Sequence, residues 1–224
     1  MIPLSPAPDE QPRRAGFSLP VDMVIAPGRA FLKIAKTNEW IPSLVVILVS
    51  GLGTVALTTP AIVQILAAAK SSHPPTAAQI ASQLAVEALL MPPLVAMLIA
   101  TTLTAMTRVK DPAAPFVRYY SLAINCLVPS ALGGLLHAAV AGLRQPSSFA
   151  SFRAYTVALP DSLGVFAAPG NERELNFLGL FNIFDAWAFI LLGFGISLFT
   201  GMRFGVALTL AAFMYFAYAL AFSQ

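Results

Sequence analysis

Charged side chains are scarce in this chain, and their scarcity excludes an ordinary soluble domain. Of the 224 residues, 10% are charged and 58% are hydrophobic, whereas a soluble domain carries about 25% charged residues. A core of this size cannot hide so many apolar side chains from water. The composition therefore predicts a membrane protein.

Other absences narrow the possible functions. The single cysteine, Cys126, excludes an internal disulfide framework, and we expect it to pack as a small hydrophobic residue. The motifs HExxH and GxSxG and the glycine-rich phosphate loop are all missing, so we expect no enzyme activity and no cofactor. The net charge of +3 is small and gives no reason to expect nucleic acid as a partner.

Five apolar runs are each long enough to cross a bilayer. About 20 helical residues, with a rise of 1.5 Å each, span ~30 Å of hydrocarbon. The sequence therefore predicts an all-α polytopic transmembrane bundle of five spans, surrounded by the lipid bilayer. The spans, within a domain of residues 41–222, are Ile41 to Ala69 (interrupted at Pro60), Leu84 to Met106, Phe116 to Leu143, Leu180 to Thr200 and Phe204 to Phe222.

The segments outside these runs have their own signatures. Residues 1–21 are polar and rich in proline, which predicts a disordered tail. No continuous apolar core of a signal peptide is visible there, so we expect the first span to direct insertion. In residues 22–40, apolar side chains alternate with lysine and arginine, which predicts an interfacial amphipathic helix ending at Trp40.

The loop of residues 144–179 is the longest connection, and it is unusual unless it contains structure of its own. The patch SSFASFRAYTVAL favours a short interfacial helix, and Asn171 with Glu174 indicates a capped helix leading into the fourth span. A similar capping pattern, Thr76 with Gln79, predicts the start of the second helix.

Orientation follows from the distribution of lysine and arginine. With the N-terminus inside, the cytoplasmic segments hold nine of these residues and the outer segments hold four. The positive-inside rule then predicts a cytoplasmic N-terminus and, with five spans, an outer C-terminus. The nine are Arg13, Arg14, Arg29, Lys33, Lys36, Arg108, Lys110, Arg118 and Arg203, and the four are Lys70, Arg144, Arg153 and Arg173.

Glu87, His137 and Asp185 are the candidate functional residues, because ionisable groups in a membrane are costly. Counted from the basic residue at the cytoplasmic end of its own helix, each lies roughly 27–32 Å away, close to the outer boundary of the hydrocarbon. This common level indicates either a shared polar cluster or three unrelated residues at an interface where charge costs little, and we expect Asp185 to face the bundle. Such a cluster would hold helices together, handle protons or ions, or bind a metal through two carboxylates and an imidazole.

A ridge of small residues on the fourth span is typical of close helix packing. Gly193, Ser197 and Gly201 form this ridge. We also expect Asn125, near the middle of the membrane, to form a hydrogen bond between helices.

Three features together resemble the Yip domain family, the Ypt/Rab-interacting-protein-like membrane proteins. They are APGRAFLKIAKTNEWIPSL before the first span, the five-span layout with the N-terminus inside, and LFNIFDAWAFILLGFGIS in the fourth span. The resemblance covers residues 22–222 and implies a helical membrane protein without catalysis. The segment DLYGP, typical of the GTPase-associated eukaryotic members, is missing, which favours a prokaryotic relative in the bacterial plasma membrane.

Two hypotheses of different classes follow from the sequence. The first is a non-enzymatic membrane scaffold or adaptor, with a protein partner or a second copy of the chain. The second is a small permease or ion pathway, with Glu87, His137 and Asp185 lining an outer vestibule. The second hypothesis requires that these side chains share a polar pocket.

Overall fold

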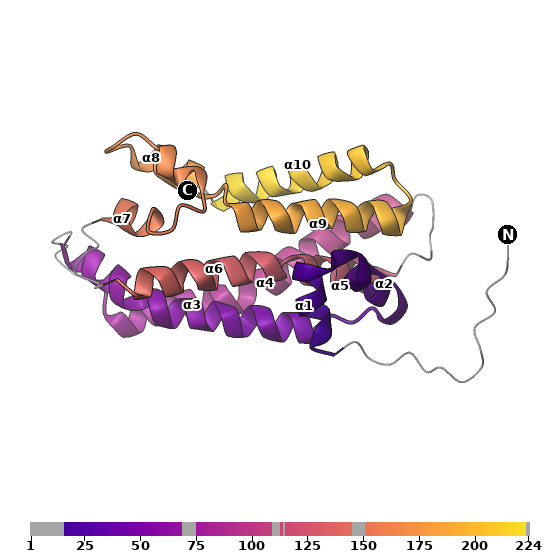
Figure 1. The fold of residues 1–224 in the computed structure, drawn as a ribbon, viewed down its shortest axis with the longest axis horizontal. Coiled ribbons are helices and arrows are strands. Elements are labelled where there is room, and N and C mark those ends of the chain that lie inside the picture. The colour runs from indigo at the N-terminus through magenta and orange to yellow at the C-terminus, as the bar shows by residue number, and fades with distance from the viewer. Residues whose placement is uncertain (1–15, 69–74, 109–112, 114, 145–150, 223–224) are drawn as a thin grey trace.

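The computed structural model describes residues 16–68, 75–108, 113, 115–144 and 151–222, and this part of the chain is helical apart from its connections (Figure 1). Ser162 and Asn182 form an isolated antiparallel bridge. The helices are α1 (Ser18–Ile25), α2 (Pro27–Thr37), α3 (Ile41–Ala68), α4 (Ala77–Arg108), α5 (Phe116–Cys126), α6 (Val128–Gly142), α7 (Phe152–Thr156), the short 3-10 helix η2 (Leu163–Phe166), α8 (Glu172–Gly179), α9 (Ile183–Thr200) and α10 (Phe204–Phe222).

Four helical stretches in the described part of the chain are long and apolar enough to cross a membrane. They cover Ile41–Ala67, Ala77–Arg108, Phe116–Gly142 and Ile183–Thr200. The described apolar stretch of α10, Phe204–Ala217, is shorter. The structure thus confirms an all-helical protein with four helices suited to a bilayer, and the fifth span stays a prediction.

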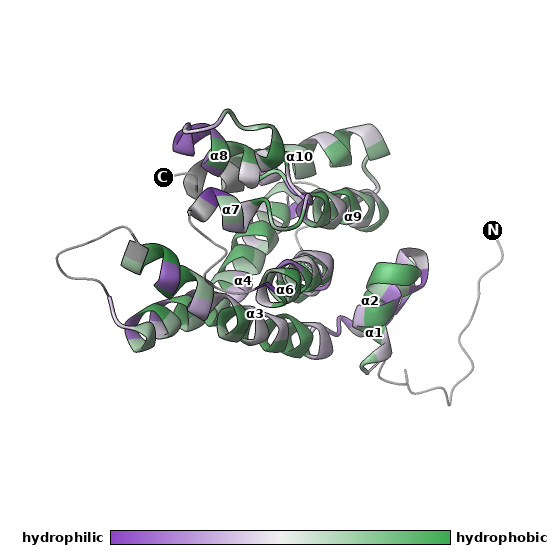
Figure 2. Ribbon diagram, turned by 60° about the vertical axis from the view of Figure 1, so that its left-hand side comes forward, coloured by the Kyte–Doolittle hydropathy of each residue, from purple (hydrophilic) through white to green (hydrophobic). Residues whose placement is uncertain are grey.

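The long helices lie roughly parallel and form two groups (Figure 1). In the larger group, α3 packs against α4 and α6, and α4 packs against α5. In the smaller group, α9 pairs with α10 and rests on α6 and α5. Hydrophobic residues dominate the long helices over much of their surface (Figure 2), as expected for helices in contact with lipid.

Proline explains where one predicted span divides. The run Phe116 to Leu143 forms two helices that meet at Leu127, because Pro129 lies in the first turn of α6 and has no N–H to donate to the preceding turn. By contrast, α4 continues through Pro92 and Pro93 as one helix. Its predicted start is confirmed, since Gln79 N donates to Thr76 Oγ1 over 3.2 Å and Thr76 N donates to Gln79 Oε1 over 2.8 Å.

The N-terminal region differs from the expected single helix of residues 22–40. Two helices form instead: α1 begins at Ser18, inside the range expected to be a disordered tail, while residues 1–15 lie outside the described part. The break falls at Ala26 because a residue before proline disfavours the helical conformation, and Pro27 follows. Asp22 accepts a hydrogen bond from Lys33, and Arg29 lies 3.3 Å from the same carboxylate.

The apolar face of α2 is buried in protein rather than laid on lipid. Phe31 and Ile34 are 5% and 0% exposed and belong to the main core. Trp40 packs edge-on against Tyr120 of α5, with ring centroids 5.3 Å apart. The amphipathic pattern was therefore interpreted correctly as a helix. The expected position at the membrane interface differs from what is seen, because α1 and α2 dock against the end of the bundle formed by α3, α5, α6 and α9.

A buried amide cluster, formed by Asn125, Ser43, Ser121 and the carbonyl of Glu39, ties this end together. The Asn125 amide donates to Glu39 O over 2.9 Å and to Ser121 O over 2.7 Å, and its oxygen accepts from Ser43 Oγ. Ser121 Oγ also donates to Glu39 O over 2.7 Å. Asn125, Ser43 and Ser121 are all fully buried. The expected interhelical hydrogen bond of Asn125 is confirmed.

At the opposite end, the described part of the long loop folds over the bundle. Ile183 N, at the start of α9, donates to Asp161 O over 2.9 Å, and Leu163 N donates to Phe181 O over 3.0 Å. Arg144 reaches from the end of α6 to the carbonyl of Ala158 over 3.0 Å. These bonds fix the loop between α6 and α9, where the candidate site lies.

Candidate functional site

The start of α9 explains why a carboxylate interrupts an apolar run. Asn182 is the N-cap of this helix, and its side-chain oxygen accepts from Asp185 N over 2.8 Å. The Asp185 carboxylate in turn accepts from the Asn182 amide. A negative side chain is stabilised at this position by the unpaired N–H groups of the first turn. The capped helix predicted from Asn171 and Glu174 forms as α8, but it ends before α9 begins.

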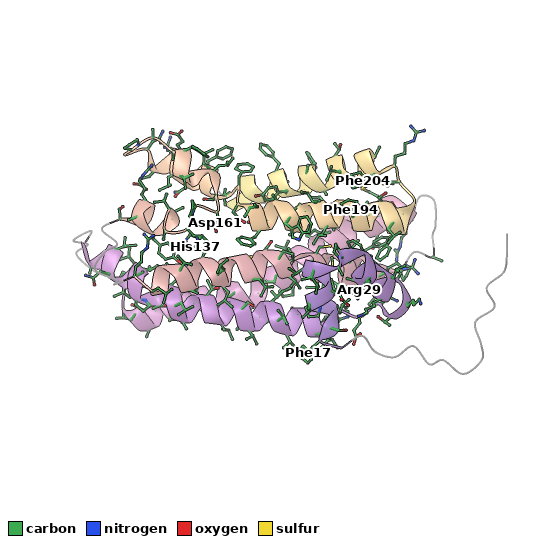
Figure 3. All side chains as sticks on the ribbon, viewed as in Figure 1. Phe17, Arg29, His137, Asp161, Phe194 and Phe204 are labelled. Atoms are coloured by element: carbon green, nitrogen blue, oxygen red, sulfur yellow. The ribbon has the colours of Figure 1, made fainter. Side chains whose placement is uncertain are left out.

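His137 bridges α6 to the folded loop (Figure 3). Its Nδ1 lies 3.3 Å from both carboxylate oxygens of Asp161, and its Nε2 lies 3.2 Å from the carbonyl oxygen of Tyr155. The rings of His137 and Tyr155 are also in contact, with centroids 5.4 Å apart. Burial and, to a smaller extent, the negative charge of Asp161 raise the pKa of Tyr155 to about 12, so its hydroxyl stays protonated at neutral pH.

Both ring nitrogens of His137 have oxygen neighbours from other segments. Nδ1 faces the Asp161 carboxylate of the loop, and Nε2 faces the Tyr155 carbonyl of α7. His137 therefore ties α6 to both the loop and α7.

These residues line a partly open cavity of about 280 Å³, here called the His137 cavity. The Ser162 hydroxyl is buried and has no hydrogen-bond partner among the described residues, whereas the buried Ser130 hydroxyl lies beside the Asp185 carboxylate and donates to it. Buried hydroxyls are normally paired with protein or water. The cavity is lined by Ser130, Gly133, Gly134, His137, Tyr155, Thr156, Asp161, Ser162, Gly179, Asn182 and Asp185.

A second cavity of about 390 Å³, here called the central cavity, lies beside the first. The two cavities share Ser130 and Asp185. Met91 and Pro92 of α4 also line the central cavity, so the proline pair faces the bundle interior as the sequence predicted. The remaining lining is mostly apolar: Ile47, Thr54, Ala88, Val95, Leu127, Ala131 and Phe189.

The structure brings His137 and Asp185 into one cavity but places Glu87 elsewhere. Glu87 is exposed on α4, where Gln83 donates to it over 3.4 Å, and it lines neither cavity. The grouping by depth was therefore wrong for Glu87. Equal depth does not bring side chains together, because α4 packs against α3 and α5 whereas His137 and Asp185 lie on the adjoining helices α6 and α9.

The three small residues of the predicted ridge have different surroundings. A side chain at Gly193 would meet the backbone of Leu208 at 3.1 Å, so this glycine allows α9 and α10 to approach closely. Ser197 donates to the Met202 carbonyl over 2.8 Å. Gly201 ends α9 with φ of +68° and has no neighbour within 4 Å. Its role is therefore the turn rather than packing.

Sequence reasoning missed Asp161, the partner of His137. Asp161 lies in a loop, where no helical period relates its position to that of a residue on a span. The proline-aspartate-serine run at 160–162 gave only a turn signal. Among the described residues, no group of three or more histidine, cysteine or acidic side chains is arranged to hold a metal ion.

No protein-family model, curated protein or solved structure matches this chain.

Proposed function

We propose that this chain is a five-span integral membrane protein that admits a small polar solute or ion through its two joined cavities, as a small permease or ion pathway. In this proposal the N-terminus is cytoplasmic, the C-terminus lies outside, and the His137 cavity opens at the outer face of a bacterial plasma membrane. The observation that carries the proposal is the sharing of Ser130 and Asp185 by the two cavities.

Several contacts support this assignment. Ionisable groups within membrane spans usually face a water-filled cavity and mark the path of a substrate or ion. Asp185 lines both cavities, while Trp187, two residues further along α9, is 39% exposed on another side of the helix. The buried amide cluster of Asn125 lies at the other end of the bundle, where the helices pack tightly. This arrangement corresponds to a pathway open at one end and closed at the other.

Thiol labelling of the full chain in membranes tests access to the joined cavities. We expect a cysteine at Ser130 to react with a membrane-impermeant cationic thiol reagent added from outside, because Ser130 lines both cavities. A cysteine at Leu132, which is 36% exposed on the bundle surface, is the matched control and should stay unlabelled. Failure to label Ser130→Cys in a folded protein would contradict the proposal.

Flux measurements in reconstituted vesicles test transport itself. A proton gradient across vesicles that carry the full chain should dissipate faster than across empty vesicles. Asp185→Asn should abolish this difference, whereas Glu87→Gln should not, because only Asp185 lines the cavities. Equal flux in wild type and Asp185→Asn would exclude a proton pathway through Asp185.

A membrane scaffold or adaptor of the Yip type is the second candidate, and one observation favours it. Phe17, Val21 and Ile25 form an apolar stripe along α1 and are 65%, 56% and 70% exposed. Leu32 of α2 is 60% exposed beside it. Apolar side chains on a docked surface helix are typical of contact with lipid or a protein partner. A second copy of the chain is one such partner.

Cross-linking distinguishes this candidate from the permease. For an adaptor, Ile25→Ser should reduce cross-linking to a partner or to a second copy, and Asp185→Asn should have no effect on it. For the permease, Asp185→Asn changes flux and Ile25→Ser does not. Loss of flux in the Ile25→Ser protein would mean that α1 also supports the pathway.

A further inference from the structure

The His137 cavity has more acidic groups than basic ones. Its ionisable side chains are the carboxylates of Asp161 and Asp185 and the imidazole of His137. Asp161 is close enough to Asp185 to repel it electrostatically. His137 lies against Asp161, whereas Asp185 accepts from the Asn182 amide and the Ser130 hydroxyl and forms no ion pair among the described residues.

Hydroxyl groups lie beside this carboxylate. Ser130 and Asp185 line both cavities, and Ser162 lines the His137 cavity with Asp161 and Asn182. The buried Ser162 hydroxyl has no partner among the described residues, and the Ser130 oxygen, which donates to Asp185, can still accept. A carboxylate and two hydroxyl oxygens are acceptors, and a protonated primary amine offers three N–H donors.

From this geometry we propose that the His137 cavity binds a small organic cation through a protonated amine, which pairs with Asp185 and donates to Ser130 and Ser162. The inference rests on the proposed solute-admitting function and names the class of solute. A volume of about 280 Å³ is far more than a bare metal ion occupies, and the described residues form no cluster suited to a metal. An anion would be repelled by the two carboxylates.

Thermal unfolding of the purified full chain in detergent tests the inference with ethylammonium chloride as the probe. Sodium chloride controls for ionic strength, and acetamide is a neutral molecule of similar size. We expect ethylammonium alone to raise the unfolding temperature in a saturable way.

Variants assign the effect to the cavity. Asp185→Asn should abolish it, and Ser130→Ala and Ser162→Ala should each weaken it about fivefold, since each removes one hydrogen bond to a charged group. Glu87→Gln should leave it unchanged. Ser162→Ala keeps the test valid if Asp185→Asn fails to fold, because the Ser162 hydroxyl has no partner among the described residues.

The inference is overturned if ethylammonium stabilises Ser130→Ala, Ser162→Ala and wild type equally, or if sodium chloride or acetamide has the same effect. These results are separable from failure of the proposed function. If Ser130→Cys is labelled from outside but ethylammonium shows no selective effect, the joined cavities are accessible and the solute belongs to another class.

Discussion

The two polar groups of this bundle, one at each end, are built from similar side chains but differ in how completely they are hydrogen-bonded. In the buried amide cluster, every polar atom of the Asn125 side chain has a partner. In the His137 cavity, the buried Ser162 hydroxyl has no partner among the described residues, and the Asp185 carboxylate beside Ser130 forms no ion pair there. A fully satisfied network stabilises one structure, whereas an unsatisfied one has capacity for a ligand. Polarity in a membrane bundle therefore indicates function only when hydrogen bonds remain unformed.

Asn125→Ala should have the largest effect on stability. It leaves the Ser43 hydroxyl without an acceptor and removes two donated hydrogen bonds in a fully buried site. We expect the free energy of unfolding to fall by about 2–4 kcal/mol. Equilibrium unfolding in mixed micelles of increasing sodium dodecyl sulfate content measures this change. A loss below that of the serine variants in the cavity would remove the contrast between the two ends.

Gly195→Ala tests whether the helices beside the amide cluster are packed tightly. An added Cβ would lie 2.2 Å from a methyl group of Leu122, which is fully buried. Overpacking of this kind should cost about 1–3 kcal/mol in the same unfolding measurement. Gly205→Ala is the matched control, because nothing lies within 4 Å of its position and alanine favours a helix. Equal losses for the two variants would argue against tight packing at Gly195.

Tyr155 makes the His137 end sensitive to alkaline pH. Its pKa is raised from 10.0 to about 12 by burial and by Asp161. Because the folded-state pKa lies above the unfolded value, this group's stabilisation is complete below about pH 10 and is lost as the pH rises toward 12. Absorbance titration of the phenolate should show a high-pKa tyrosine that is missing in Tyr155→Phe. Asp161→Asn should lower that pKa, and an unchanged titration would contradict the electrostatic contact.

Ser130→Ala and Ser162→Ala should have the smallest effects on stability. The Ser162 hydroxyl has no partner within the described structure and the Ser130 hydroxyl has only the Asp185 carboxylate, so each change should alter the free energy of unfolding by no more than about 1 kcal/mol. The same variants are expected to weaken ethylammonium binding, so stability and binding separate at these positions. Strong destabilisation would mean that these hydroxyls belong to a structural network like that of Asn125.

The helices were predictable because hydrophobic runs and local signals determine them. Thr76 with Gln79 marked the start of α4, and Asn171 with Glu174 marked that of α8. The N-terminal break was missed although Pro27 was visible, because an amphipathic period continues across the proline and gives no sign of a change in direction.

The site was only partly predictable because it depends on which helices are neighbours. Depth along a span follows from counting residues, and it placed His137 and Asp185 at one level. The position of a side chain around its helix does not, so Glu87 was grouped with His137 and Asp185 although it lies outside both cavities, including the central cavity that its helix α4 lines. Asp161 reaches His137 through a folded loop whose path is set by backbone hydrogen bonds to the start of α9. The periodicity of the sequence carries no information about such a contact.

Cys126 gives the molecule a reporter of its own unfolding. This lone thiol is 2% exposed and lies next to Asn125 in the most tightly packed part of the bundle. A thiol reagent reaches it only when these helices separate, so its rate of modification measures how often the native protein opens there. In Asn125→Ala this rate should increase, while in Ser162→Ala it should not, and no cysteine has to be introduced to observe the difference.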